Sequence, residues 1–505
     1  MDPQARKPPR MALWLGLVFA LILGAGGTFA WLLAKAGARR PVRVLLVTAP
    51  QPEAAGLDPA ECRAIGALVQ DHLECFGGMA VTTVTRMPED LAPLTARPGT
   101  QVLVLEPRRT GMQLALSFRS AEVGPDSLQG GLRWSRTEAR PQEPIAAFGQ
   151  FSRDRGLSAD PRPGILIPNS APCFWDLLRA GALRLRNEHL EEATALAQKV
   201  VLAAPDCASG WILLGNLQYR GLLNNPQAYQ KDQEDAETLL AKGLARLPDH
   251  PRGTFLLALM KTDNGDARDA LALLVQARRA QPNNPLLLTG LAYAARNAGL
   301  LVLARRAMDL RDNLTFPEYL PQAVDMTCLY TGEVARFEAS LRDEPGHLRN
   351  TSGVVPFYRG YLALVRGDRD GAHAAFTVAR QAPLGYPSIV RLAEVFDLIL
   401  EGRKQEAWQR LRAFDQDRLG MREPDGEFTL RLAEAYALMG DRASALEMAN
   451  RAFARGFGCT AWYEKSPLLA SLHGLPRWES LLQHLRERQR LMEETFPASL
   501  VESPS

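Results

Sequence analysis

The chain has 505 residues, of which 46% are hydrophobic and 23% are charged, proportions that are usual for folded proteins. This length leaves room for roughly two to four domains. The formal net charge of +3 is small for the length. The overall charge therefore provides no drive towards nucleic acid or an acidic surface, and no nucleic-acid partner is predicted.

The first part of the sequence predicts a membrane anchor. Residues 1–10 form a short basic tail, and residues 11–34 are 24 residues without a charge. Such a run can cross a hydrocarbon core of ~30 Å at about 1.5 Å per residue. It exceeds the ~7–15 residues of a signal-peptide core, which favours a retained transmembrane helix over a cleaved signal. Basic residues flank both ends, so charge leaves the orientation open.

Small residues recur at every fourth position of this predicted helix, at Gly16, Ala20, Gly24 and Thr28. This spacing lets two membrane helices approach closely, as in GxxxG pairs. It therefore suggests a homodimer that pairs through this face. The alternative is that glycine and alanine are simply common in membrane helices.

Residues 41–168 predict a small α/β domain. Its first strand is 42–47, a short apolar run. Asp58 is placed to cap a helix over 59–76, which the glycine pair at 77–78 ends. Further strands are predicted at 79–85, 102–106, 112–120 and 132–134, with a hairpin turn across 108–111.

Residues 174–456 carry a repeat of 34 residues, which is the period of tetratricopeptide (TPR) helix hairpins. Seven or eight hairpins are predicted, with extra residues inside the second, within 222–235, and a degraded fifth near 321–345. Because each hairpin packs only on its neighbours, such an array curves into a superhelix with a concave groove. The strictest pairs are Pro248 and Pro282, Leu257 and Leu291, Gly265 and Gly299, and Ala270 and Ala304.

Residues 457–505 are expected to close the array. A polar-faced helix over 478–492 would provide the cap that an exposed repeat edge requires. The six cysteines form no CxxC pair, which argues against a zinc knuckle or a thioredoxin-type site. Their even number permits disulfides, but their scatter favours buried single thiols. They are Cys62, Cys75, Cys173, Cys207, Cys328 and Cys459.

The segment 41–168 resembles the TolB-like domain that bacteria place between a membrane helix and a TPR array. The resemblance rests on Pro41–Leu46, on the helix and glycine pair that follow, on Val102–Glu106 with Arg108 and Arg109, and on Gly131–Arg136. A departure is that the first loop lacks the family's usual Pro-Phe and Asn. These are fold signatures, and none of them is catalytic.

The C-terminal segment, with Trp462 and Leu475–Trp478, is similar to the ending of TPR regions in membrane-bound winged-helix regulators and TPR-bearing kinases. The resemblance implies a mainly α fold, with a TPR superhelix preceded by a small α/β domain and one N-terminal transmembrane helix. It also implies a single-pass protein of the bacterial inner membrane whose soluble part lies outside the cytoplasm. Those relatives carry an output domain ahead of the membrane helix, where this sequence has ten residues.

Catalytic signals are missing from the sequence. No phosphate-binding loop, nucleophile elbow or HExxH motif occurs, and the seven histidines are scattered. We therefore predict no enzyme activity, no cofactor and no metal. A set of arginines is the best groove candidate for an acidic or carboxylate-ended peptide, because guanidinium forks suit carboxylates; a solvated helix face is the alternative. The set is Arg278, Arg279, Arg296, Arg305 and Arg306.

Two functions are consistent with these features. The first is a membrane-anchored scaffold or adaptor that binds a protein partner through the superhelical groove. The alternative is a sensor or regulatory subunit of a signalling or envelope-assembly system whose output domain is on another chain. An enzyme with an unfamiliar site in the α/β domain is disfavoured, because no His, Cys or carboxylate cluster is evident in the sequence.

Overall fold

The computed structural model describes residues 42–48, 56–97, 99–123, 134–157, 164–224, 229–319, 325–341, 353–382, 387–419 and 425–502. Apart from Glu502, these residues belong to one compact unit, Val42–Val501. The predicted transmembrane helix, with Gly16, Ala20, Gly24 and Thr28, lies outside the described residues. None of the helices within the described ranges is long and apolar enough to cross a membrane.

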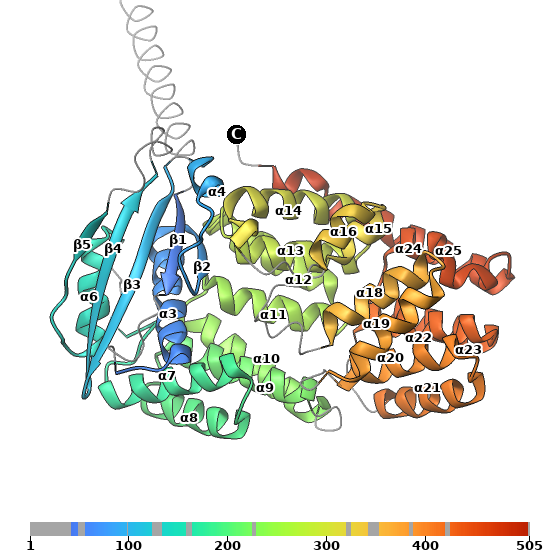
Figure 1. The fold of residues 1–505 in the computed structure, drawn as a ribbon, viewed down its shortest axis with the longest axis horizontal. Helices are drawn as coiled ribbons and strands as arrows, with labels where there is room; N and C mark the ends of the chain where they lie inside the picture. The colour runs from blue at the N-terminus through green and yellow to red at the C-terminus, as the bar shows by residue number, and fades with distance from the viewer. Residues whose placement is uncertain are drawn as a thin grey trace, which may run out of the picture. The chain divides into compact units, whose positions relative to one another are not determined.

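A five-stranded sheet forms from the first part of the described chain, in the order β2-β1-β3-β4-β5. In Figure 1 it stands at the left, beside the helices of the array. β1 pairs in parallel with β2 and β3, whereas the β3–β4 and β4–β5 pairs are antiparallel. The strands are β1 (Arg43–Thr48), β2 (Ala80–Val84), β3 (Gln101–Thr110), β4 (Gln113–Glu122) and β5 (Ser135–Thr137). The predicted α/β character of this segment is confirmed.

Two details of the predicted sheet were wrong. Thr110 pairs with Gln113, so β3 runs through Arg108 and Arg109, and the turn lies two residues further on. Gly111 has a φ of 60° there, which a two-residue hairpin requires and glycine supplies without strain. The last strand was also predicted too early in the chain, because Trp134 precedes β5.

The helix α3 (Pro59–Gly77) begins and ends as the sequence predicts. The Asp58 side chain accepts hydrogen bonds from the backbone N–H groups of Ala60 and Glu61, and the Glu61 side chain accepts one from the Asp58 N–H. This reciprocal capping box satisfies donors that the first turn leaves unpaired. Gly78 ends the helix with a φ of 59°, a left-handed conformation that favours glycine.

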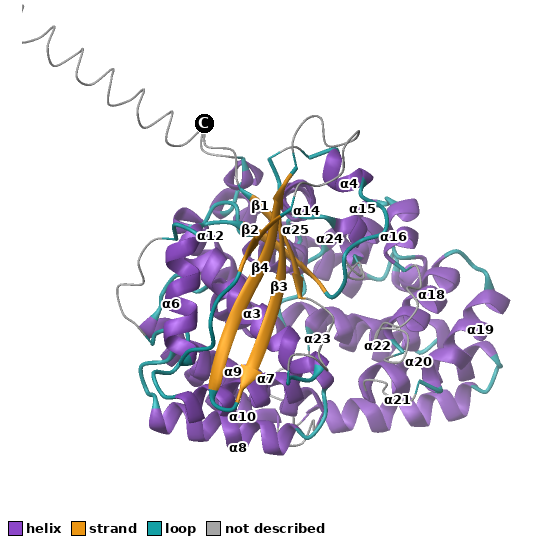
Figure 2. Ribbon diagram, turned by 60° about the vertical axis from the view of Figure 1, so that its left-hand side comes forward, coloured by secondary structure: helices purple, strands orange, loops and turns teal. Residues whose placement is uncertain are grey.

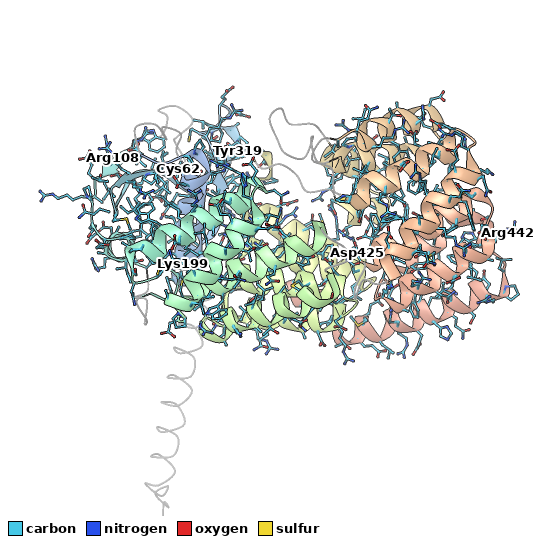
Figure 3. All side chains as sticks on the ribbon, turned by 90° about the horizontal axis from the view of Figure 1, so that it is seen from below. Cys62, Arg108, Lys199, Tyr319, Asp425 and Arg442 are labelled. Atoms are coloured by element: carbon cyan, nitrogen blue, oxygen red, sulfur yellow. The ribbon has the colours of Figure 1, made fainter. Side chains whose placement is uncertain are left out.

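Helices and loops cover both faces of the sheet (Figure 2). α3 and α6 (Pro144–Asp154) share an apolar core with one face. The other face packs against α4 (Ala92–Thr95) and Phe316, which precedes the 3-10 turn η1 (Pro317–Tyr319). The Tyr319 hydroxyl, labelled in Figure 3, donates a 2.7 Å hydrogen bond to the Asp90 carbonyl. A segment that follows the fourth helix pair of the array therefore packs on the sheet.

The rest of the unit is mainly helical and repeats one motif, a pair of antiparallel helices. The pairs in the described residues are α7 (Ala171–Arg186) with α8 (Leu190–Ala203), α9 (Ala208–Asn224) with α10 (Tyr229–Arg246), α11 (Pro251–Asp263) with α12 (Ala267–Ala280), α13 (Pro285–Asn297) with α14 (Leu301–Leu314), α15 (Met326–Thr331) with α16 (Val334–Ser340), α18 (Val354–Val365) with α19 (Arg369–Arg380), α20 (Pro387–Leu400) with α21 (Lys404–Leu419), and α22 (Gly426–Met439) with α23 (Arg442–Ala454). The predicted repeat of helix hairpins is confirmed, including the short fifth pair.

The 34-residue period reflects two packing needs. Ala270 and Ala304 are completely buried where the helices of a pair meet. Gly265 and Gly299 follow α11 and α13 with φ angles of 89° and 86°, which turn the chain sharply into the second helix of each pair. The six cysteines are unpaired, and five of them are buried, as the sequence favours.

The end of the chain does more than cap the last pair. After α23 come α24 (Thr460–Lys465), η2 (Pro467–Leu472), α25 (Pro476–Thr495) and η3 (Ala498–Val501). Phe496 and Val501 belong to the same apolar core as α12, α13 and α14. The Gly458 N–H donates a 2.7 Å hydrogen bond to the Asn297 carbonyl. The array therefore closes on itself, and its end packs on the third and fourth pairs.

Candidate functional site

Two of the five arginines that the sequence nominates are buried inside this closure. Arg278 donates hydrogen bonds of 3.0 Å to the Leu500 carbonyl and 3.4 Å to the Pro282 carbonyl. Arg296 forms a 2.7 Å ion pair with Glu427 on α22. Neither guanidinium is available to a ligand, so the prediction is wrong for these two residues. The physical reason is that Arg278 holds the C-terminal turn η3 on α12, whereas Arg296 holds α13 and α22 together.

The other three arginines do not complete an open carboxylate site. Arg305 pairs with Glu333 at 2.8 Å and with Asp309 at 3.4 Å. Arg279 and Arg306 are exposed on α12 and α14. A guanidinium that already holds two carboxylates has little left to offer an acidic peptide. The five arginines therefore do not form one site in the structure.

The superhelical groove itself is largely filled by the chain. The first helix of each pair would line such a groove, yet no residue of 251–263, 285–297 or 353–365 is exposed. α11 is covered in part by α3, since Arg252 donates two hydrogen bonds of 3.1 Å to the Asp71 carboxylate. Little of the predicted partner groove is therefore open along these helices, and other parts of the same chain cover α11 in part.

A buried ionic cluster, here called the Arg431 cluster, lies where the halves of the array meet. It comprises Tyr330, Tyr361, Glu427, Arg431 and Glu434. Arg431 pairs with Glu434 at 3.0 Å and donates to both tyrosine hydroxyls. The hydroxyls in turn donate to Glu434 and Glu427. A buried charged network needs its partners present, so this cluster is a structural joint and not an open site.

Asp425, labelled in Figure 3, marks the same joint at the start of α22. Burial is the main reason why the pKa of Asp263 is raised to about 7, and the nearby Asp425 carboxylate raises it further. Asp263 accepts a 2.6 Å hydrogen bond from the Tyr293 hydroxyl and another from the Tyr219 hydroxyl. At this joint, burial therefore favours the protonated form of Asp263, whereas the two tyrosine hydrogen bonds favour its charged form.

The described residues also line a cavity of about 470 Å³ between the sheet and the array, here called the β2 cavity. Its lining includes residues of β2, α13 and α14. This volume falls within the ~300–1,000 Å³ of typical ligand sites. Its lining residues are Gln70, Glu74, Val81, Thr82, Thr83, Pro285, Leu286, Thr289, Met308, Arg311, Asp312, Thr315, Pro317, Asp325, Arg336, Ala339 and Ser340.

One wall of the β2 cavity carries a buried carboxyl group. Glu74 accepts a 2.7 Å hydrogen bond from the Gln70 amide and a 3.1 Å bond from the Asn284 amide. Burial is the main reason why its pKa is raised to about 7. The Thr83 hydroxyl donates to Gln70 at 2.9 Å, which links this group to β2. The wall therefore presents hydrogen-bonding groups that α3 and β2 hold in place.

The opposite wall carries charges that balance one another. Arg311 and Arg336 each approach an oxygen of Asp312 at 2.7 Å. Leu286 and Met308 add apolar surface between the two walls. The cavity can thus hold a mainly neutral group that is partly apolar and forms hydrogen bonds. Sequence reasoning missed it, because its walls come from segments more than 200 residues apart.

A smaller cavity of about 90 Å³ brings Asp71, Ser209 and His250 together. His250 Nε2 lies 4.0 Å from Asp71, and neither His250 nitrogen nor the Ser209 hydroxyl bonds to another described residue. A catalytic relay needs contacts of about 2.6–3.2 Å. The Asp71–His250 pair is therefore too far apart for such a relay. Burial also lowers the pKa of His250.

His373, Asp397 and Glu401 form a group within the described residues that is close enough to hold a metal ion. Asp397 is already bonded, at 2.5 Å to His373 Nδ1 and at 2.9 Å to Arg380. Glu401 pairs with Arg403 at 2.7 Å. A cation would have to displace two guanidinium groups, so these residues fit an ion-paired helix contact better than a metal centre.

Comparison with known proteins adds little to this geometry. No protein-family model matches the chain, and no curated protein does. Among solved structures, the chain is similar to the TPR domain of P58(IPK), with 12% identity over 65% of this chain and 99% of that one. The TM-score of 0.18 is too low to carry an argument. The mainly helical, hairpin-repeat fold is therefore established by the helix pairs themselves.

Proposed function

We propose that this protein is a scaffold that binds a segment of a partner protein in the β2 cavity. The observation that carries the proposal is the cavity's composition, because α3 and β2 supply one wall and the array supplies the other. Neither part alone could form it. Hydrogen-bonding groups stand beside apolar ones, which is the usual character of sites for polypeptide segments.

The setting of this scaffold rests on the sequence. The uncharged run 11–34 supports a single-pass membrane anchor. The resemblance to membrane-bound regulators supports a bacterial inner membrane, with the described unit outside the cytoplasm. The spacing of Gly16, Ala20, Gly24 and Thr28 supports a homodimer. Resemblance to the TolB-like sensor halves of membrane regulators supports the alternative role, a sensor or regulatory subunit whose output domain is on another chain. The two roles share the same binding step and differ in what the partner does.

Site-specific photocrosslinking tests the proposal. Benzoylphenylalanine in place of Thr289 would stand in the cavity wall, and the same group in place of Leu202 would stand on α8, where the side chain is 83% exposed. In cells, irradiation should attach a discrete polypeptide at position 289 and not at 202. A bulky Thr289→Trp variant should lose that partner in a pull-down. Identical products at both positions, or none at 289, would refute cavity binding.

A further inference from the structure

The strand β2 ends the sheet on the side of the β2 cavity. The Ala80 N–H donates a 3.0 Å hydrogen bond to the Val42 carbonyl, so the backbone of Ala80 faces β1. In a strand, the backbone groups of successive residues point to opposite sides. Those of Val81 and Thr83 therefore point away from β1. Both residues line the cavity.

This free edge is buried without a strand partner. Val81 is 4% exposed, and within the described ranges no backbone hydrogen bond joins another segment to the outer side of β2. Buried backbone groups are almost always paired. An open sheet edge is also a template for another strand. The cavity thus offers the unpaired N–H and C=O groups of Val81 and Thr83, with room beside them.

We propose that an extended peptide segment adds to β2 as a sixth strand inside the β2 cavity. The proposal rests on the function proposed above and names its binding mode. A segment of about five residues matches the length of β2 at ~3.3 Å per residue. Main-chain hydrogen bonds to Val81 and Thr83 supply the affinity, and side chains at alternate positions supply the specificity.

The walls define which peptide fits. Side chains on the α3 side of the added strand meet Gln70 and Glu74, so a hydrogen-bond donor such as Ser, Thr or Asn belongs there. Residues that face the array meet Leu286 and Met308, so β-branched apolar side chains belong there. Arg311 is already balanced by its own acidic partner, so a charged peptide gains little. The occupant is a short, mostly neutral strand.

The test begins with a phage library of random octapeptides, selected on the full-length protein. The selected peptide is then synthesised with N-methyl groups on alternate backbone nitrogens, in both registers. N-methylation in the register that faces β2 should weaken binding about tenfold or more, because each buried hydrogen bond lost counts fully. The other register should bind like the parent peptide. Fluorescence polarisation measures both.

A matched pair of variants tests the same contact from the protein side. Thr83→Pro removes an edge N–H that points away from β1, where an edge strand tolerates proline. Thr83→Val keeps that N–H and removes only the hydroxyl bonded to Gln70. The proline variant should weaken peptide binding about tenfold, and the valine variant should not. Circular dichroism checks folding, and the N-methylated peptides still decide the question if Thr83→Pro unfolds.

The outcomes separate this inference from the proposed function. A peptide that Thr289→Trp excludes, but that binds equally in both N-methylated forms, occupies the cavity without strand pairing and overturns the inference alone. Peptides insensitive to Thr289→Trp, or a selection that yields no peptide, overturn strand addition and count against the cavity as a polypeptide site. Strand addition is supported if binding is weakened by N-methylation only in the register that faces β2, and is also weakened in Thr83→Pro.

Discussion

Replacement of Arg431 by methionine should destabilise the whole unit. The Arg431 side chain is 2% exposed and the Glu434 side chain is fully buried. The guanidinium bonds to Glu434 on the same helix, α22, and to the hydroxyls of Tyr330 on α15 and Tyr361 on α18. Arg431→Met removes the positive charge but leaves a side chain of similar length, so the loss is electrostatic more than steric.

The magnitude follows from the partner that is left behind. Breaking a buried ion pair from one side costs about 3–5 kcal/mol, because the remaining charge stays buried. Glu434 keeps hydrogen bonds of 2.9 Å from Trp462 and 3.0 Å from Ser466. These bonds retain part of its stabilisation, so we expect the lower end, about 3 kcal/mol. Adding Glu434→Gln, which removes the negative charge but keeps an acceptor, should recover part of that loss.

Urea unfolding of the full-length chain, followed by circular dichroism, measures these changes as shifts of the midpoint at constant slope. The single variant should unfold at clearly lower urea than the parent chain, and the double variant between the two. A loss below about 1 kcal/mol, the range of exposed pairs, would refute the view that this cluster joins the halves of the array. So would a double variant less stable than Arg431→Met alone.

Three further variants test other parts of the structure. The pKa of Glu74 is raised by burial from 4.5 to about 7, so the folded state keeps a proton that the unfolded state releases, and stability falls as pH rises between these values. Glu74→Gln should remove that slope and be more stable than the parent by about 3 kcal/mol at pH 8, as urea titrations at several pH values would show. Gly299→Ala should lower the melting temperature more than Gly440→Ala does. Both glycines have φ near 87°, a left-handed conformation that alone costs an alanine about 1–2 kcal/mol. Only at Gly299 would the added Cβ also meet an atom, the Gly458 carbonyl oxygen at 2.2 Å. Asp58→Ala removes the side-chain cap of α3 and should lower the free energy of unfolding by about 1 kcal/mol, measured by urea unfolding.

Each of these variants has an outcome that would contradict its reasoning. If the stability of Glu74→Gln fell with rising pH as steeply as that of the parent, a group other than Glu74 would cause the pH dependence. Equal losses for Gly299→Ala and Gly440→Ala would mean that the contact with the C-terminal segment is loose. An Asp58→Ala chain as stable as the parent would show that the capping box adds nothing once α3 is packed on the sheet.

The sequence by itself determined the local elements. The cap at Asp58 and the glycines after residue 76 located α3 to within a residue at each end. The 34-residue period located the third and fourth helix pairs, because Gly265 and Gly299 must adopt positive φ and Ala270 must let two helices touch. Such signals act between residues that are neighbours along the chain, so they can be read without knowing the fold.

Only the tertiary structure decided where the proposed binding site lies. Arg296 looks like a groove residue in the sequence, yet it pairs with Glu427, 131 positions away. Glu74, which lines the β2 cavity, accepts a hydrogen bond from Asn284 across 210 positions. Small rotations between successive helix pairs add up along an array, and their sum determines whether the groove stays open. That sum is a property of packing, which no local pattern in the chain encodes.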